Sequence, residues 1–331
     1  MLLLSKNDIK KVFSIKDAIE ADKYAFRIFS EGKSVVPLRV NVSSPNYEGQ
    51  TLFMPGQVSD LDSIGVKIVS VFPNNITKGK KSVSATMILI DGTNGEVCCI
   101  LDGTYITQLR TGAASGAATD VLARPDASIA AIIGTGGQAS TQLESILAVR
   151  KIKEVRVFDA NWERTSLFAN EMQKELACYG AAICPVETAE AAIKDADIIT
   201  TVTTSSHPVF DGRRIKQGAH INAVGSYMPH MQELDEYIVQ HADKIFCDSV
   251  DAVIAESGDF IIPINKGLIT AEKITGEIGQ VIANSVRGRE RADEITLFKT
   301  VGIAVQDVVT AYQVYQKAKA QQIGQDYAFA D

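Results

Sequence analysis

The stretch Ile129-Ala130-Ala131-Ile132-Ile133-Gly134-Thr135-Gly136-Gly137-Gln138-Ala139 decides the fold class of this 331-residue chain. An apolar, strand-like run leads directly into a glycine-rich turn, and helical spacing follows it. In that context Gly134 permits a tight turn, Gly136 lets the backbone approach a pyrophosphate, and Ala139 allows the helix to pack closely on the strand. Unpaired N–H groups at the helix N-terminus favour phosphate oxygens. The pattern predicts a dinucleotide-binding loop that also includes Gly137 and Gln138.

An acidic residue stands where the ribose of such a nucleotide is expected. The next strand-like run ends in Val157-Phe158-Asp159, and Asp159 lies 20 residues beyond Ala139, the spacing at which a carboxylate receives the ribose hydroxyls. A carboxylate there repels a 2′-phosphate, so NAD(H) is favoured as cofactor. NADP(H) stays an alternative because Arg164 could fold toward a phosphate.

Around this stretch the chain alternates strands with helices, which predicts a parallel, doubly wound Rossmann sheet over residues 125–305. Arg124-Pro125-Asp126 marks the expected boundary. Before it come an amphipathic helix over 14–32, five strand-like runs with a hairpin signal at Asn94-Gly95, and a small-sided helix from 104. Residues 294–324 read as a last helix. We expect the residues before this boundary to form a first domain, and the last helix to return and pack on it.

Composition excludes several classes of protein. The net charge of -7 and the scattered basic residues argue against a nucleic-acid partner. Because no apolar run is long enough for a membrane helix or a signal peptide, we expect a cytoplasmic protein. The five cysteines form no metal or disulfide pattern and read as buried, reduced thiols. The four histidines are not spaced for metal binding, so no metal is expected.

Three basic residues fall in otherwise apolar or small-sided segments of the first domain. Arg39 lies in VPLRVNV, Lys67 in GVKIVSVFP, and Arg110 in QLRTGAASGAAT. A lone cation in such a segment points either to solvent or to something anionic, because burial without an opposite charge is costly. Three together suit a pocket for a substrate carboxylate, in which an arginine can form two parallel bonds.

Seven stretches, spread over nearly the whole chain, resemble the ornithine cyclodeaminase and mu-crystallin family. They are VPLRVNV, TLFMPG, GVKIVSVFPNN, QLRTGAASGAAT, IIGTGGQA, GAHINAVGSYMPHMQELD and TLFKTVGIAVQD. The resemblance implies that residues 1–124 and 306–331 form an α+β substrate and dimerisation domain, into which the Rossmann domain of residues 125–305 is inserted. It further implies a dimeric enzyme that binds NAD(H) or NADP(H) and acts on amino or cyclic imino acids. It also implies that Arg39, Lys67 and Arg110 hold the substrate carboxylate and that Thr111 approaches the cofactor.

One departure from the family pattern narrows the reaction. Tyr227 stands where the cyclodeaminases carry a catalytic aspartate, and a phenol with a pKa of about 10 is poorly matched to handling an amine at neutral pH. The sequence therefore favours NAD(P)H-dependent reduction of a small imino acid such as pyrroline-2-carboxylate, or reversible amino acid dehydrogenation. Ornithine cyclodeamination and a weakly catalytic, NAD(P)H-bound ligand-binding protein like mu-crystallin remain alternatives.

These considerations complete the set of candidate site residues. Lys67, Arg110 and Tyr227 are assigned catalytic roles, and His230 is a weaker candidate for the substrate pocket, whereas His220 is read as a structural hydrogen-bonding residue. The hydroxyl-rich segment 200–206 follows a parallel strand at the edge where dinucleotides bind. The residues assigned to the cofactor side in addition to the loop and Asp159 are Thr111, Arg164, Thr203, Val224, Ser226 and Thr300.

Overall fold

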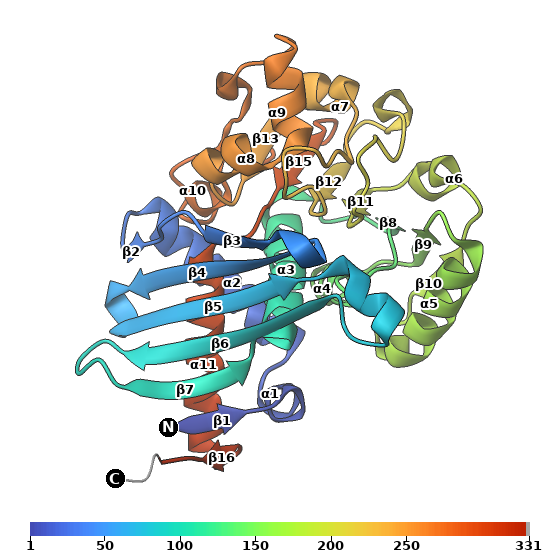
Figure 1. The fold of residues 1–331 in the computed structure, drawn as a ribbon. Helices are drawn as coiled ribbons and strands as arrows, with labels where there is room; N and C mark the ends of the chain where they lie inside the picture. Colours follow the sequence, from blue (N-terminus) through green and yellow to red (C-terminus); the bar gives the residue numbers. More distant parts are fainter. Residues whose placement is uncertain (329–331) are drawn as a thin grey trace. The chain divides into compact units, whose positions relative to one another are not determined.

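The computed structural model describes residues 1–328, which divide into two compact units (Figure 1). Unit 1 comprises Met1–Arg110 and the segment from Ile303 onward, and unit 2 comprises Thr111–Gly302. The boundaries therefore lie at 110/111, inside helix α3 (Gly103–Leu122), and at 302/303, not at the expected 124/125 and 305/306. Residues 329–331, which the sequence assigned to the first domain, lie outside the described residues.

A mixed, mostly antiparallel sheet forms the body of unit 1. The expected strand-like runs all form strands, and Asn94-Gly95 turns the chain between the last two. In spatial order the strands run β16-β1-β7-β6-β5-β4-β2, and β3 also pairs with β4. Their bounds are β1 (Leu2–Leu4), β2 (Ser34–Val35), β3 (Val40–Ser44), β4 (Gly49–Val58), β5 (Ser63–Val71), β6 (Val83–Asp91), β7 (Val97–Asp102) and β16 (Gln325–Asp326).

The run that contains Arg39 departs from the expectation. It forms two short strands, β2 and β3, instead of one, and residues 36–39 between them belong to neither. Pro37 accounts for the break, because proline lacks the N–H that a strand donates to its neighbour. Arg39 is therefore half-buried in a connection and not inside a strand.

Unit 1 also contains helices α1 (Lys6–Val12), α2 (Ile15–Ser30) and α11 (Ala304–Ala320), together with the first residues of α3. Helix α2 confirms the predicted amphipathic helix and begins with a capping box between Ser14 and Asp17. Helix α11 packs on α2 and on strands β4 and β5, and Figure 1 shows it crossing the sheet. The last helix was expected from residue 294, but residues 296–299 form a strand. A run of only four residues does not by itself distinguish a strand from a helix.

Unit 2 contains the predicted doubly wound sheet, and all of its strand pairs are parallel. The spatial order is β10-β9-β8-β11-β12-β15-β13-β14. The connections reverse direction between β8 and β11, which is the point at which such sheets bind ligands. The bounds are β8 (Ile129–Ile133), β9 (Glu154–Phe158), β10 (Ala182–Pro185), β11 (Ile198–Thr201), β12 (His220–Ala223), β13 (Lys244–Cys247), β14 (Gly276–Glu277) and β15 (Thr296–Lys299).

Helices flank this sheet, and every residue of β11, β12 and β15 is buried because both faces of the sheet are covered there. The helices of unit 2 after α3 are α4 (Ala139–Val149), α5 (Trp162–Glu175), α6 (Ala189–Ile193), α7 (Glu236–His241), α8 (Val250–Glu256), α9 (Gly258–Asn265) and α10 (Ile278–Ile282). Within residues 1–328, no helix is long and apolar enough to span a bilayer. All five cysteines are free, but Cys178 and Cys184 are exposed, so the expectation of buried thiols is wrong for these two.

Candidate functional site

Unit 1 places the predicted basic residues close to a carboxylate that the sequence analysis missed. Lys67 lies on β5 and Arg110 on α3, and their exposed fractions are only 1% and 6%. The Lys67 ammonium donates to both oxygens of Asp307 on α11, at 2.9 and 2.8 Å, and the Arg110 Nε donates to Oδ1 at 3.2 Å. Asp307 is fully buried, so it is the anionic partner that the buried cations require.

Asp307 was overlooked because it stands among the valines of the last helix, where it reads as an isolated polar residue. The signal was an acid on an otherwise apolar helical face, since buried carboxylates need a cationic or hydrogen-bonding partner. The preceding residue is also held from within unit 1, because the Gln306 side-chain amide donates to Asp22 of α2 at 2.8 Å. This bond explains why Asp22 interrupts the apolar face of α2.

Lys67, Arg110 and Asp307 form a buried cluster, and burial changes the protonation of Lys67. Burial and the neighbouring Arg110 lower the pKa of Lys67 to about 7, although Asp307 acts to raise it, and Arg39 is close enough to lower it slightly further. The cations of Lys67 and Arg110 thus face one carboxylate, so the cluster of Lys67, Arg110 and Asp307 keeps excess positive charge while Lys67 is protonated. Among the described residues, none accepts a hydrogen bond from the two Nη atoms of Arg110. The cluster can therefore receive the carboxylate of a small ligand.

In unit 2 the glycine-rich turn between β8 and α4 has the geometry that a pyrophosphate needs. Gly134 has a φ of 102°, and a Cβ there would lie 2.7 Å from the carbonyl oxygen of Val202. A Cβ on Gly136, by contrast, would meet no protein atom within 4 Å, so space is open beside the backbone. Helix α4 begins at Ala139 and directs its first N–H groups toward this turn. These residues fit a bound dinucleotide.

Asp159 directly follows the end of β9, beside the same turn. Its carboxylate accepts bonds from the backbone N–H and the hydroxyl of Thr135, at 2.9 and 2.8 Å. Although burial alone would raise the pKa of Asp159, these bonds and one from the Asn161 N–H lower it. Arg164 lies 3.8 Å away and is mostly exposed. Asp159 is therefore a fixed carboxylate that shapes the turn.

The other residues predicted for the cofactor side lie along the carboxyl ends of the strands of unit 2, with Thr111 in α3 and Gln138 just before α4. The Gln138 side-chain oxygen is buried without a partner among the described residues. The hydroxyls of Ser226 and Thr300 are already used, since they donate to the Met231 carbonyl at 2.8 Å and to Asp248 at 2.7 Å. Their side chains hold loops together.

Thr203 and Val224 follow β11 and β12, where both backbones are tied to neighbouring groups. The Thr203 N–H donates to Glu233 at 2.5 Å, and the Val224 N–H donates to the carbonyl of Thr201 at 3.0 Å. Glu233 is fully buried and was not among the predicted residues. Its signal in the sequence was weak, because a single acid in a loop is most often solvated.

Tyr227 and the histidines also belong to unit 2. Tyr227 is half-buried on the loop after β12, so the residues assigned catalytic roles are divided between the two units. His230, the weaker candidate, is exposed on the same loop. His220 confirms the structural interpretation, because its ring nitrogens contact Thr296 at 3.0 Å and Asn222 at 3.1 Å. Burial lowers the pKa of His220 to about 3 and keeps it neutral.

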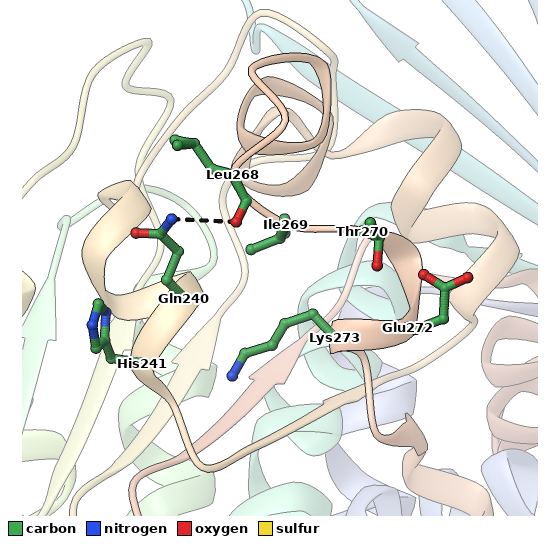
Figure 2. A pocket seen from close by; sticks show the side chains of 7 residues that line it. All are labelled: Gln240, His241, Leu268, Ile269, Thr270, Glu272 and Lys273. Atoms are coloured by element: carbon green, nitrogen blue, oxygen red, sulfur yellow. Dashed lines mark hydrogen bonds between the residues drawn. The ribbon is translucent and has the colours of Figure 1, made fainter.

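A surface pocket of about 570 Å³ in unit 2 lies apart from all these residues (Figure 2). In Figure 2 the side-chain amide of Gln240 donates to the carbonyl oxygen of Leu268 across one side of the pocket, at 3.3 Å. The Lys273 ammonium donates to the carbonyl oxygen of Ala242 at 2.9 Å. Because these polar groups already have protein partners, nothing in the pocket points to a ligand.

Solved structures share this architecture over almost the full length of the chain. The Δ1-pyrroline-2-carboxylate reductase of Thermococcus litoralis, in complex with NADH and L-proline, matches with a TM-score of 0.94 and 42% identity and covers 99% of this chain and 100% of that one. An archaeal alanine dehydrogenase dimer with bound NAD matches with a TM-score of 0.91 and 34% identity, covering 100% of this chain and 99% of that one.

Sequence relatives lead to the same group of proteins. A Δ1-pyrroline-2-carboxylate reductase from Bacillus cereus is 38% identical over 329 residues, which are 99% of this chain and 100% of the relative. The ketimine reductase mu-crystallin of Mus musculus is 31% identical over 90% of both chains. The model of the ornithine cyclodeaminase/mu-crystallin family matches residues 1–322. The chain belongs to the ornithine cyclodeaminase/mu-crystallin family.

Proposed function

We propose that this protein is an NAD(H)-dependent oxidoreductase that reduces a small imino acid to the corresponding amino acid, with a cyclic ketimine such as Δ1-pyrroline-2-carboxylate as the first candidate. The observation that carries the proposal is the buried cluster of Lys67, Arg110 and Asp307 in unit 1. It combines excess positive charge with two Arg110 Nη atoms that have no partner among the described residues. The names of the relatives support the same chemistry.

In this proposal the residues of unit 1 bind and orient the substrate. The Arg110 Nη atoms grip the substrate carboxylate through two parallel bonds, with Arg39 as a further positive charge. Lys67, whose pKa is lowered to about 7, exchanges a proton near neutrality and can supply the one that the substrate nitrogen gains. Asp307 holds the Lys67 ammonium in place through both carboxylate oxygens.

The cofactor belongs to unit 2. Gly134, Gly136 and the N-terminus of α4 would hold the pyrophosphate, and Asp159 would receive the ribose hydroxyls. When bound, the nicotinamide supplies the hydride that reduces the C=N bond. The ionised carboxylate of Asp159 supports NAD(H) over NADP(H), because it would repel a 2′-phosphate. Structures of relatives with bound NADH or NAD support the same choice.

We also propose that the protein works as a homodimer in the cytoplasm. Strand β3 exposes Val40 and Val42 on one face, at 57% and 53%, and the neighbouring Val35 and Leu38 are exposed at more than 60%. An apolar strip of this kind on a sheet suits pairing with a second copy, and the archaeal alanine dehydrogenase is a dimer. The five free thiols suit a reducing compartment.

An enzymatic screen tests the proposed reaction. The purified full-length protein is mixed with NADH and either Δ1-pyrroline-2-carboxylate, Δ1-piperideine-2-carboxylate or a 2-oxo acid with ammonia, and the loss of NADH absorbance is followed. We expect turnover with at least one cyclic ketimine and slower turnover with NADPH. A parallel ammonia assay with ornithine and NAD+ tests cyclodeamination, which Tyr227 disfavours. Binding of NADH without turnover of any of these substrates would refute the proposed reaction and favour a ligand-binding protein.

A further inference from the structure

The side chains next to Lys67 on its own face of the unit 1 sheet are apolar. Because side chains alternate along a strand, Lys67 shares this face with Val69 and not with Val66. Lys67 and Val69 are buried, whereas Val66 is half-buried on the other face. On the neighbouring strand β4, Met54 lies opposite Lys67 and Leu52 lies opposite Val69. The ammonium-bearing side chain of β5 is therefore surrounded by hydrocarbon within its own sheet.

These neighbours belong to a small hydrophobic cluster of unit 1, which we call the apolar cluster. Its four buried members and the two partly buried residues that pack on them are Leu52, Met54, Val69, Ala304, Val36 and Ala85. Ala85 lies opposite Val69 on β6, so Leu52, Val69 and Ala85 form one row across three adjacent strands (Figure 1). All six side chains are uncharged.

The segments that supply the charged residues of unit 1 also supply the apolar cluster. On β5, Val69 follows Lys67 by two residues and lies on the same face. On α11, Asp307 lies three residues after Ala304, a spacing that places both on one side of the helix. The connection that carries Arg39 begins with the valine that packs on the cluster. A ligand whose carboxylate lies at the cations therefore has the apolar cluster beside it.

Burial decreases along the strands from Lys67 toward their outer end. In the row next to Lys67, Val69 is 7% exposed and Ala85 is half-buried. In the row after that, Val71 is half-buried and its partner Val83 is 38% exposed. The apolar cluster thus lies between the buried cations and the more exposed end of the sheet, where a small ligand can contact both.

The two groups of residues define the chemistry of a matching ligand. The cations require a carboxylate, and the apolar cluster offers only hydrocarbon and one thioether to the rest of the molecule. Asp307 already binds Lys67 and Arg110, so it does not serve a second ammonium. A charged group pressed against the apolar cluster would lose its hydration without gaining a partner, which is costly.

We propose that the apolar cluster binds the hydrocarbon part of the imino acid and selects substrates whose ring or side chain carries no charge. The inference rests on the proposed function, because it concerns the substrate of the same site. Imino acids with a saturated ring or a short aliphatic side chain are accepted, and those with a basic or a second acidic group are rejected. Leu52 and Val69, in the row next to Lys67, are the specificity-determining residues.

The test compares the affinities of four amino acids for the full-length protein saturated with NADH, measured by isothermal titration calorimetry. NADH is used because the reduced cofactor cannot oxidise the added amino acid. L-Proline and L-norvaline are apolar, whereas L-ornithine and L-glutamate carry an ammonium or a carboxylate on a side chain of similar length to that of norvaline. We expect the two apolar amino acids to bind more tightly than the charged ones by about tenfold or more.

Two variants test the assigned residues. Val69→Thr keeps nearly the shape of the side chain and places a hydroxyl in the apolar cluster, so we expect norvaline to bind about tenfold more weakly. Leu52→Gln should act in the same direction, and the test then does not depend on one variant folding. Val66→Thr is the matched control, because it makes the same change beside Lys67 but on the opposite face. It should keep the affinities of the unmodified protein.

The outcomes separate this inference from the proposed function. Binding of ornithine or glutamate to the unmodified protein as tightly as norvaline would overturn the inference, as would an unchanged norvaline affinity in both Val69→Thr and Leu52→Gln. Preferential binding of the apolar amino acids without turnover of any imino acid would support the inference and refute the proposed reaction. Binding of none of the four amino acids would overturn both.

Discussion

Arg110 is the residue whose replacement most directly tests the carboxylate site. Its Nε binds Asp307, and its Nη atoms remain for a ligand. Arg110→Met keeps much of the apolar stem and removes the guanidinium, so we expect KM for the imino acid to rise by roughly 10- to 100-fold, because bonds to charged groups contribute about 1.5–3 kcal/mol each. Steady-state kinetics and NADH titration check this. NADH affinity should not change, and Arg213→Met on the surface of unit 2 is the control.

The lowered pKa of Lys67 predicts that imine reduction slows as the pH rises. Its pKa is lowered to about 7, so the ammonium is present below that pH and is lost as the pH rises through it. We expect kcat/KM for imine reduction to fall above about pH 7. Because the negative charge of a bound carboxylate raises the pKa of Lys67, kcat should fall at a higher pH. The measurement is a pair of pH profiles, and Lys67→Met should lose the descending limb of any residual activity.

Asp159 tests the choice between the two nicotinamide cofactors. Replacing it with Ala removes the fixed carboxylate that accepts bonds from Thr135. We expect weaker NADH binding by about tenfold, the effect of losing roughly 1.4 kcal/mol, together with a smaller penalty for NADPH because the repulsion of the 2′-phosphate is gone. Fluorescence titrations with both cofactors measure this. Glu163→Gln, exposed in the first turn of α5, should leave both affinities unchanged.

At the scale of secondary-structure elements, two glycines are predicted to affect different properties. Gly112 affects the stability of the protein, and Gly136 affects the binding of the cofactor. A Cβ on Gly112 of α3 would lie 2.5 Å from the backbone oxygen of Thr141 on α4, whereas one on Gly136 would meet no protein atom within 4 Å. We therefore expect Gly112→Ala to lower the free energy of unfolding by about 1–3 kcal/mol, the usual cost of overpacking. Gly136→Ala should melt normally but lose NADH affinity, because its Cβ enters the space for the pyrophosphate.

Thermal melting and NADH titration of both variants check this contrast. A Gly136→Ala protein that binds NADH as tightly as the unmodified protein would mean that the open space beside the turn is not the pyrophosphate site. A Gly112→Ala protein with an unchanged melting temperature would show that α3 and α4 can separate slightly without loss.

At the scale of the whole molecule, the exposed apolar face of β3 predicts an assembly of two chains. Val42→Lys places a charge on the strip that Val40 and Val42 expose, and burying an unpaired charge in an interface is costly. We expect sedimentation or light scattering to give the mass of two chains for the unmodified protein and a shift toward one chain for the variant. Leu167→Lys, at an exposed apolar residue of α5, is the control. A monomeric unmodified protein would contradict the proposed dimer.

The sequence alone determined the fold class and singled out the glycine-rich turn between β8 and α4 as the candidate nucleotide loop. Both depend on local features, namely the alternation of apolar strands and helices and the backbone freedom of glycines such as Gly134, so they can be recognised within a few dozen residues. Short segments were predicted less well, because their periodicity fits more than one type of secondary structure. The segment Thr296–Lys299 was predicted to be helical but forms a strand, and Arg39 was predicted to lie inside a strand but lies in a connection. A run of four residues is too short to show its periodicity, and the sequence does not show which residues pair with it in space.

Only the tertiary structure decided how the charged groups are paired. Lys67 and Asp307 lie 240 residues apart in the chain, and Glu233 reaches loops that follow two different strands. A buried ionisable side chain is acceptable only if its partner is present, but that partner is supplied by the fold and has no fixed spacing in the sequence. The sequence therefore identified the cations of the candidate site, and the fold supplied the carboxylates that hold them and set their charge.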